Sequence, residues 1–238
     1  MFRIGISSST LPQYSSFELK QFIDANNLER VDLRMNKNHN WEKDDWSIFK
    51  EDNIAFLGTD IILGDYNWSI YRIKEYLFNF KNKPVRVFAS NNLYKDKEFL
   101  RQQIMTLKKL CGSSQRILVE THDGYCTPNE IFKLSVEFHT RVLLDNLGLA
   151  MITSDFYRDV ELLQPFVLCI HIKGYNQKDP ANSLHLPIKE SNYKSIESLL
   201  NMFSRKPITV LLESKNNSFE EDLRFLLKYK NESMRCAK

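Results

Sequence analysis

An acid and an imidazole lie two positions apart at the end of a short apolar run. The run is Leu118-Val119-Glu120-Thr121-His122. Because side chains alternate between the two faces of a strand, Glu120 and His122 are expected to point the same way. Carboxylates and imidazoles are the groups that bind divalent cations and transfer protons. This stretch therefore predicts one part of a chemical site.

Three later apolar runs end in the same manner. Residues 142–144 lead to Asp145, residues 167–170 to His171, and residues 208–212 to Glu213. Several unpaired carboxylates that converge in a buried place would be costly to desolvate, and a divalent cation removes that cost. Three carboxylates and one imidazole favour one Mn²⁺ or Mg²⁺ ion, with Co²⁺ and Zn²⁺ as alternatives.

The elements that must position these groups are short apolar runs that alternate with segments of helical period. The predicted strands cover residues 4–7, 30–35, 54–57, 85–89, 116–120, 141–145, 166–172 and 208–212. Capping sequences indicate helix starts at Ser15-x-x-Glu18, at Thr127-Pro128-Asn129-Glu130 and at Ser218-x-x-Glu221. Further helices are expected over 41–50, after a cap at Asn67, around 100–111, from about 154 to 165, and around 193–203.

Eight strand-then-helix units of about thirty residues each have the length that a βαβ repeat needs. The rival fold is a doubly wound open sheet, which usually has a glycine-rich first turn. Here residues 7–10 read Ser-Ser-Ser-Thr, and the chain has no GxGxxG or Walker A motif. We therefore predict an α/β fold, a single (β/α)8 TIM-barrel domain over residues 1–238, with the catalytic groups at the carboxyl ends of the strands.

Composition excludes several classes of protein. The 238 residues carry 33 basic and 30 acidic side chains, a net charge of +3 without long blocks of either sign, so neither nucleic acid nor a membrane is expected as a partner. No signal peptide is visible, and no apolar run approaches the ~20 residues of a membrane span. The cysteines have no metal or redox spacing and are expected to be free thiols in a reducing compartment; they are Cys111, Cys126, Cys169 and Cys236. We expect a cytoplasmic protein that acts on a small molecule, and a homodimer is left open.

The ordered set of strand ends resembles the xylose-isomerase-like TIM-barrel superfamily, the sugar phosphate isomerase/epimerase group. The matching fragments are residues 118–122, Leu144-Asp145-Asn146, Ile170-His171-Ile172-Lys173, Leu186-Pro187-Ile188 and Leu212-Glu213. The resemblance implies that Glu120, Asp145, His171 and Glu213 are the metal ligands. It also implies that Glu120 and Glu213 are catalytic and exchange protons with carbons next to a carbonyl.

The sequence departs from the family pattern at three places. The family often has a histidine three residues after the sixth-strand aspartate, where this chain has Gly148. It often has an acid after the seventh-strand lysine, where this chain has Gly174. The glycine-containing turn before the seventh helix is replaced by residues 189–191. These departures leave the predicted metal ligands intact, so the resemblance implies the metal site more strongly than it implies the family's particular sugar substrates.

Several side chains near the predicted strand ends are candidates for substrate binding. His122 is expected to contact either the substrate or one of the metal-binding side chains. The basic candidates for a phosphate or carboxylate of the substrate are Arg34, Arg86, Lys173 and Lys215, with solvated rim charges or carboxylate partners as the alternative. The remaining histidines are expected in loops or helices and not as ligands; they are His39, His139 and His185.

The function that the sequence favours is a divalent-metal-dependent isomerase or epimerase. It would transfer a proton next to a carbonyl of a small sugar-like substrate, with phosphorylated and acidic compounds included. One alternative is a metal-assisted dehydratase or lyase on the same scaffold, and another is a non-catalytic barrel used as a binding module. An AP endonuclease is disfavoured, because that branch needs a three-zinc cluster with many histidines and the chain has five.

Overall fold

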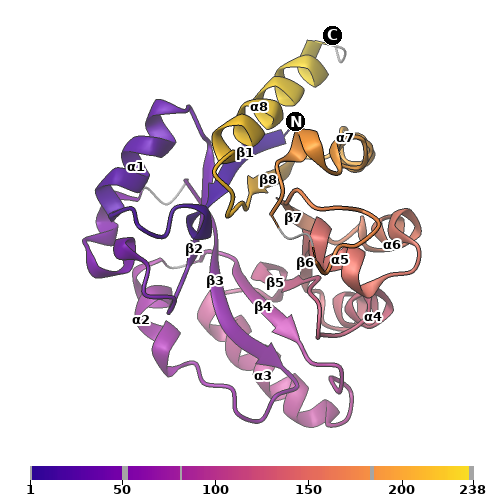
Figure 1. Ribbon diagram of the computed structural model, residues 1–238. Helices are drawn as coiled ribbons and strands as arrows, with labels where there is room; N and C mark the ends of the chain where they lie inside the picture. Colours follow the sequence, from indigo (N-terminus) through magenta and orange to yellow (C-terminus); the bar gives the residue numbers. More distant parts are fainter. Residues whose placement is uncertain (1, 50–52, 81, 183–184, 236–238) are drawn as a thin grey trace.

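Eight parallel strands close into a barrel in the order β1 to β8, with β8 paired to β1 (Figure 1). The computed structural model describes residues 2–49, 53–80, 82–182 and 185–235. The strands are β1 Phe2–Ser7, β2 Arg30–Arg34, β3 Ile54–Leu63, β4 Val85–Ala89, β5 Ile117–Glu120, β6 Arg141–Asp145, β7 Val167–Ile172 and β8 Ile208–Leu212. The predicted single (β/α)8 barrel is confirmed.

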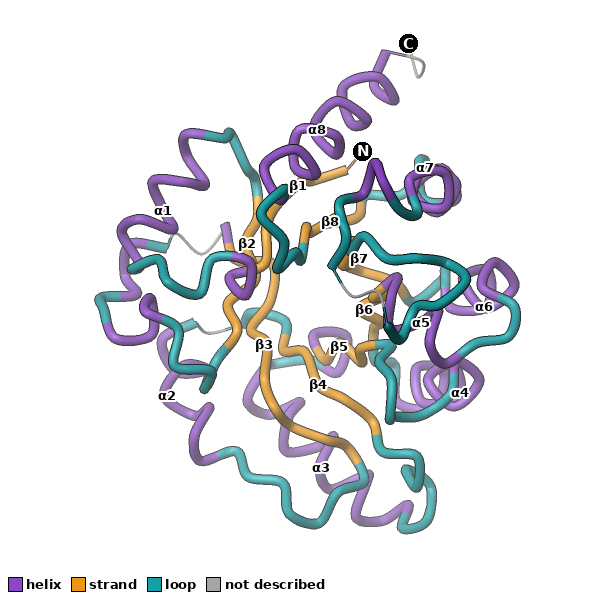
Figure 2. The backbone as a smooth tube through the Cα atoms, viewed as in Figure 1, coloured by secondary structure: helices purple, strands orange, loops and turns teal. Residues whose placement is uncertain are grey.

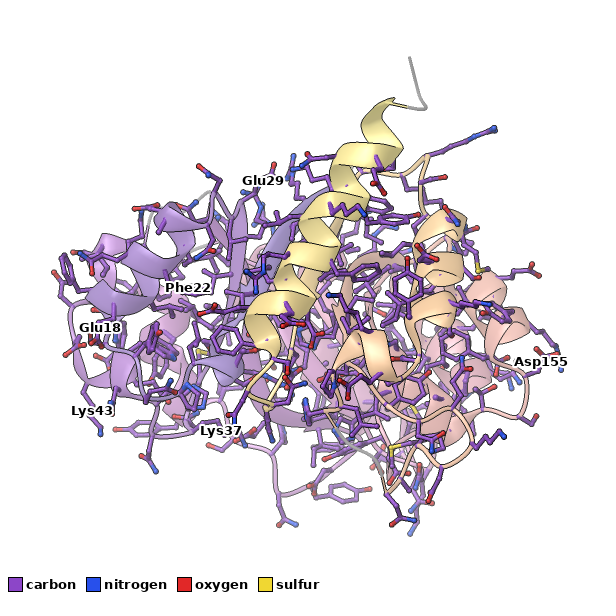
Figure 3. The ribbon with its side chains drawn as sticks, turned by 45° about the horizontal axis from the view of Figure 1, so that its top comes forward. Glu18, Phe22, Glu29, Lys37, Lys43 and Asp155 are labelled. Atoms are coloured by element: carbon purple, nitrogen blue, oxygen red, sulfur yellow. The ribbon has the colours of Figure 1, made fainter. Side chains whose placement is uncertain are left out.

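The α-helices lie outside the ring of strands (Figure 2). They are α1 Ser16–Ala25, α2 Tyr71–Asn79, α3 Lys97–Cys111, α4 Pro128–Phe138, α5 Asn146–Ile152, α6 Phe156–Leu163, α7 Tyr193–Met202 and α8 Phe219–Arg235. The first and last helices lie side by side: Phe22 of α1 contacts Phe219 of α8, with ring centroids 6.0 Å apart, and Glu29 pairs with Lys230 of α8 (Figure 3). Among the described residues, no helix has the length and apolar character needed to cross a membrane.

Two of the predicted helix starts form complete capping boxes. The hydroxyl of Ser15 accepts the backbone N–H of Glu18, whose carboxylate accepts the backbone N–H of Ser15. Thr127 and Glu130 make the same reciprocal pair, with a proline in the first turn of α4. Each cap contributes about 1 kcal/mol to helix stability. These local signals explain why α1 and α4 begin where the sequence predicts.

The interior of the barrel is filled by a layer of side chains that lies one step below the predicted ligands. Leu118, Leu143, Cys169 and Leu211 each precede a charged residue by two positions, and they pack together with Phe56. Because the side-chain period of a strand is two, the residues above them also face the barrel axis. The same alternation that fills the barrel therefore directs the charged residues to the centre of its carboxyl end.

Three local predictions are wrong. The segment predicted as a helix over 41–50 forms two short 3-10 turns, Asn40–Lys43 and Trp46–Ile48, and its last residue lies outside the described residues. Here the Glu42 carboxylate accepts three backbone N–H groups that precede it, which holds the chain in a loop. Asn67 does not cap α2. It lies four residues before the first residue of the helix, in a turn where its backbone N–H donates to the Asp65 carboxylate. Helix α5, directly after β6, was not expected.

Strand β3 is also longer than predicted. The sequence predicts its end at Leu57, yet the strand continues to Leu63. The pairing with β4 resumes beyond an irregularity after Gly58, where Ile62 faces Phe88. Both strands consequently project past the ring (Figure 1). Phe88 is thereby carried to the carboxyl end of the barrel.

Candidate metal centre

The carboxyl ends of β5 to β8 bring Glu120, Asp145, His171 and Glu213 together. All four side chains are buried, and one ligand atom from each lies within 4.8 Å of the others. We call these four residues the ligand cluster. Glu120 and Asp145 are the last residues of their strands, and Glu213 follows β8 directly. The geometry that the sequence predicts for these groups is therefore present.

Asp32 of β2 fixes the ring of His171. Its Oδ2 lies 2.8 Å from Nε2 of His171, and its Oδ1 accepts the hydroxyl hydrogen of Ser7 at 2.9 Å. The other ring nitrogen, Nδ1, faces the carboxylates and lies 2.9 Å from Glu213 Oε2 and 3.6 Å from Glu120 Oε1. A carboxylate behind a ligating histidine sets its tautomer and orientation. The sequence analysis did not single out Asp32, although it shares a strand face with Arg34.

Asp145 also begins helix α5. Its Oδ1 accepts the backbone N–H of Gly148 at 2.8 Å, so one oxygen caps the helix and Oδ2 points into the ligand cluster. A Cβ at Gly148 would lie 2.2 Å from the carbonyl oxygen of Thr121. No side chain fits at this position while α5 packs so closely on the turn after β5. The family's histidine is therefore excluded here by the backbone itself.

The side-chain amide of Asn146 holds the backbone of Lys173 in place. Asn146 of α5 accepts the N–H of Lys173 and donates to its carbonyl oxygen, each at 2.9 Å. The next residue, Gly174, accepts the N–H of Leu186, and a Cβ there would lie 1.9 Å from the Leu186 carbonyl oxygen. The loop after β7 thus folds back onto Gly174, which leaves no room for the acid of the family pattern. Asn146, which lies in one of the matching fragments, has a structural role that the sequence did not reveal.

Three cationic side chains contact the carboxylates of the ligand cluster. Lys173 Nζ lies 2.6 Å from Asp145 Oδ2 and 3.3 Å from Glu213 Oε2. Arg34 Nη2 lies 3.1 Å from Glu213 Oε1, and Arg86 Nε lies 3.1 Å from Glu120 Oε2. Lys173 and Arg86 are buried, and Arg34 is nearly so. These three basic residues therefore pair with carboxylates of the ligand cluster, and their contact with a substrate stays a prediction.

The cations keep the acids ionised. Burial alone would raise the pKa of Glu213, but the charges of Arg34, Lys173 and His171 outweigh burial and hold this pKa well below its ordinary value. The pKa values of the other two carboxylates of the ligand cluster are lowered in the same way against their burial. Burial would lower the pKa of His171, but the surrounding carboxylates, Glu213 first, raise it well above its ordinary value. Without a metal, the imidazole therefore carries a proton.

The donor atoms of the ligand cluster fit a divalent cation. Both oxygens of Glu120, Oδ2 of Asp145 and Nδ1 of His171 have no hydrogen-bond partner among the described residues, although all are buried. Ion pairs with Arg86, Lys173 and His171 offset part of the cost of burying these atoms, and coordination to one ion would satisfy the carboxylate oxygens and a neutral imidazole together. The donors are three hard oxygens and one imidazole nitrogen from a rigid barrel. The ligand cluster could therefore hold a metal ion.

A cavity of about 760 Å³ opens above the ligand cluster. We call it the mouth cavity. Its wall includes four of the predicted substrate-binding residues, Arg34, Arg86, His122 and Lys215, together with Glu213 and His39. His122 lies in the turn after β5 and packs edge-on against Phe88 and Tyr125. Lys215 is exposed at the rim. Lys173 is absent from this wall and contacts Asp145 and Glu213 of the ligand cluster.

The other histidines occupy positions that suit the expectation that they are not ligands. His139 ends α4 with a positive φ of 57°, and His185 has a φ of 58° in the loop after β7. Ser9, which the sequence analysis did not single out, donates its hydroxyl hydrogen to Glu213 Oε1 at 3.1 Å. The described cysteines are all free and buried; they are Cys111, Cys126 and Cys169. Cys236 lies outside the described residues.

Comparison with known proteins identifies the fold. No protein-family model and no curated protein matches the sequence. Among solved structures, a probable 3-DHS dehydratase, AsbF, from Bacillus anthracis superposes with a TM-score of 0.71 at 15% identity, over 95% of this chain and 99% of that chain. The chain shares the (β/α)8 TIM-barrel fold of this structure.

Two further structures share this barrel fold. A xylose isomerase domain containing protein from Salmonella typhimurium LT2 superposes with a TM-score of 0.67 at 13% identity, over 98% of this chain and 96% of that chain. A D-tagatose 3-epimerase-like protein superposes with a TM-score of 0.63 at 15% identity, over 99% of this chain and 100% of that chain. The likeness extends over the whole barrel and shows a common fold.

Proposed function

We propose that this barrel is a divalent-metal-dependent isomerase or epimerase that transfers a proton next to a carbonyl of a small sugar-like substrate. The observation that carries the proposal is the ligand cluster itself. One possible metal-ligand atom from each of its four buried side chains lies within 4.8 Å of the others, and several of these atoms have no hydrogen-bond partner among the described residues. The names of the similar structures, an epimerase-like protein and a probable dehydratase, support chemistry of this class.

The residues of the chain divide into holding and reacting groups. Glu120, Asp145, His171 and Glu213 would hold the ion, which supplies Lewis-acid polarisation of the substrate's carbonyl and hydroxyl oxygens when bound. Glu213 also borders the mouth cavity, so its carboxylate reaches the place where a substrate would lie. The cations around it keep this carboxylate ionised, which a proton acceptor must be.

Glu120 lies deeper and would serve as the second carboxylate. Arg86 holds its Oε2 at 3.1 Å, and its Oε1 faces His171. A carboxylate on each side of a bound substrate can remove a proton from one carbon and return one to the same or the neighbouring carbon. Return to the same carbon inverts its configuration, and return to the neighbour moves the carbonyl. The two carboxylates would therefore suit either outcome.

A dehydratase is a second candidate because of Lys173. Its ammonium group lies 3.3 Å from Glu213 Oε2, next to the proposed base. Burial opposes its positive charge, but Asp145 and the two glutamates raise the pKa of Lys173, so the side chain keeps its proton. A proton donor beside the base could protonate a leaving hydroxyl group after a proton is removed from the adjacent carbon. The proposed reactions thus share their first step.

The test combines metal binding with hydrogen exchange. We expect the purified protein to bind about one Mn²⁺ per chain, measured from the electron paramagnetic resonance signal of free Mn²⁺. The loaded protein is then incubated in D₂O with a panel of ketoses and oxo sugars, and proton NMR follows exchange next to the carbonyl. Glu213→Gln is expected to reduce exchange by about 10²- to 10⁴-fold, and Glu98→Gln on the exposed face of α3 is the control.

The outcomes separate the candidate functions. Exchange without loss of water supports an isomerase or epimerase, and loss of water supports a dehydratase. Stoichiometric Mn²⁺ without any exchange across the panel supports a binding module. Absence of Mn²⁺ binding at millimolar concentration contradicts all metal-dependent reactions proposed for this site.

A further inference from the structure

Arg86 is a buried guanidinium with unused hydrogen-bond donors beside the ligand cluster. Its side chain is 1% exposed, and its Cζ lies 4.3 Å from the centroid of the Phe88 ring. Its Nε faces Glu120, but Nε and Nη1 have no hydrogen-bond partner among the described residues. It nevertheless borders the mouth cavity. Because Nε and Nη1 are covered by the protein, an acceptor in the mouth cavity would bind at the remaining nitrogen, Nη2.

Arg34 lies next to Arg86, and a glycine makes this possible. Both side chains cross over Gly58 of β3: a Cβ there would lie 2.7 Å from Arg34 Cδ and 3.2 Å from Arg86 Nη2. Arg34 contacts Glu213 with one nitrogen and approaches Glu120 with another, and it also borders the mouth cavity. The two guanidinium groups thus form one donor surface on the wall of the cavity, directly beside the proposed ion.

The formal charges of the groups that contact the ligand cluster indicate the charge of the missing acceptor; water screens the exposed Lys37, Asp60 and Lys215 at the mouth, which do not enter the sum. Four contacting acids contribute −4, from Asp32, Glu120, Asp145 and Glu213, and three cations contribute +3, from Arg34, Arg86 and Lys173. A histidine must be neutral to bind a metal, so His171 adds nothing. A divalent ion then changes the sum from −1 to +1. A monoanion balances this charge, a neutral sugar leaves it at +1, and a dianion reverses it to −1.

We propose that the substrate of this site is a small polyhydroxylated oxo acid whose single carboxylate binds to Arg34 and Arg86. The planar guanidinium group matches a carboxylate with two parallel hydrogen bonds. This inference rests on the proposed metal-dependent function and names its class of substrate. It excludes neutral sugars and sugar phosphates as the preferred ligands of the mouth cavity.

The first experiment compares three small probes on the Mn²⁺-loaded protein. Pyruvate is the monoanionic oxo acid, hydroxyacetone is its neutral counterpart, and inorganic phosphate is the dianion. Bound Mn²⁺ broadens the methyl proton resonances of pyruvate or hydroxyacetone when either probe binds close to the ion. Calorimetry then compares the affinities of all three probes, after titrations of each probe into free Mn²⁺ have been subtracted. We expect pyruvate to bind at least ten-fold more tightly than either other probe. If pyruvate binds no more tightly than hydroxyacetone, or if phosphate binds most tightly, the proposal is wrong.

The second experiment changes the arginine. Arg86→Gln is expected to weaken pyruvate binding at least ten-fold while one Mn²⁺ remains bound. Arg86→Lys is expected to restore only part of the affinity, because lysine keeps the positive charge but lacks the planar set of N–H donors. Arg101→Gln, on the exposed face of α3, is the matched control and should change nothing. Wild-type pyruvate affinity in a folded Arg86→Gln protein would overturn the proposal. Because Mn²⁺ binding is measured separately, failure of the metal site itself is distinguished from failure of the carboxylate site.

Discussion

A single carboxylate decides how His171 presents its ring to the barrel. Asp32 contacts Nε2, so Nδ1 alone faces the three acids of the ligand cluster. Asp32 is itself fixed by the hydroxyl of Ser7 at the end of the neighbouring strand. Such a chain of contacts selects the tautomer in which the nitrogen lone pair at Nδ1 is free for an ion. Asp32 is therefore a positioning residue for the proposed metal site.

Replacing this carboxylate should weaken metal binding without unfolding the barrel. We expect Asp32→Asn to reduce Mn²⁺ affinity by about 10- to 100-fold, because the amide preserves the shape but does not favour one imidazole tautomer. The electron paramagnetic resonance titration measures this affinity. Asp24→Asn, at the exposed partner of Lys20 on α1, is the matched control. Unchanged Mn²⁺ affinity in the Asp32 variant would show that the ring is oriented by other contacts.

The ligand cluster could be predicted from residue types, whereas its supports could not. Glu120, Asp145, His171 and Glu213 end apolar runs, and the two-residue period of a strand gives their direction. Asp32 and Asn146 acquire their roles only from the register between strands and from a helix that the sequence did not indicate. The partners of the three cations likewise depend on distances across the barrel, which no local pattern contains.

At the scale of elements, helix α5 determines how one ligand is presented. The helix begins immediately after β6 and uses Asp145 as its N-cap. The sequence predicts no helix for this segment. Its first turn packs on the turn after β5, where Gly148 touches the carbonyl oxygen of Thr121. Thr121 in turn exchanges hydrogen bonds with the backbone of Asp145, at 2.9 and 3.0 Å. The departure at Gly148 is thus a packing requirement.

Adding one methyl group at this contact should destabilise the protein. We expect Gly148→Ala to reduce the free energy of unfolding by about 1–3 kcal/mol, because its Cβ would overlap backbone atoms that cannot move without shifting β5. Urea denaturation measures the change. Gly124→Asn is the control, since its Cβ would meet no atom within 4 Å and asparagine tolerates its positive φ of 78°. Equal stability of the Gly148 variant and the wild type would contradict the packing argument.

Elements with a strong internal period were predicted well, and those shaped by tertiary contacts were not. The four strands that carry the ligand cluster agree with prediction to within one residue at each end. The segment from Trp41 failed because its aromatic residues pack from a loop: Trp41 is fully buried, and Trp46 stacks on Tyr76 with ring centroids 4.5 Å apart. An apolar pattern alone does not distinguish such a loop from a helix.

For the whole molecule, closure of the barrel is what makes the charges interact. Asp32 and Arg34 come from β2, while their partners His171 and Glu213 come from the far end of the chain. The pairing of β8 with β1 brings these segments to the same ring. Eight repeats of similar length were enough to predict the closed ring, because no strand edge then stays open. The network of charges is consequently a property of the complete fold.

This network should make the metal-free protein sensitive to acid. The Glu213 pKa in the folded state lies well below its ordinary value, because nearby positive charges outweigh the effect of burial. Its contribution to stability is therefore fully present above the unfolded-state pKa of about 4.3 and is lost as the pH falls through the folded-state pKa. In the presence of a chelator, we expect the free energy of unfolding of the wild type to fall more between pH 7 and pH 3.5 than that of Glu213→Gln, by about 1 kcal/mol. Urea denaturation at the two pH values measures the difference, and Glu98→Gln, whose side chain is 66% exposed, should behave like the wild type. If Glu213→Gln loses as much stability as the wild type, the cations around the ligand cluster do not stabilise the fold through this carboxylate.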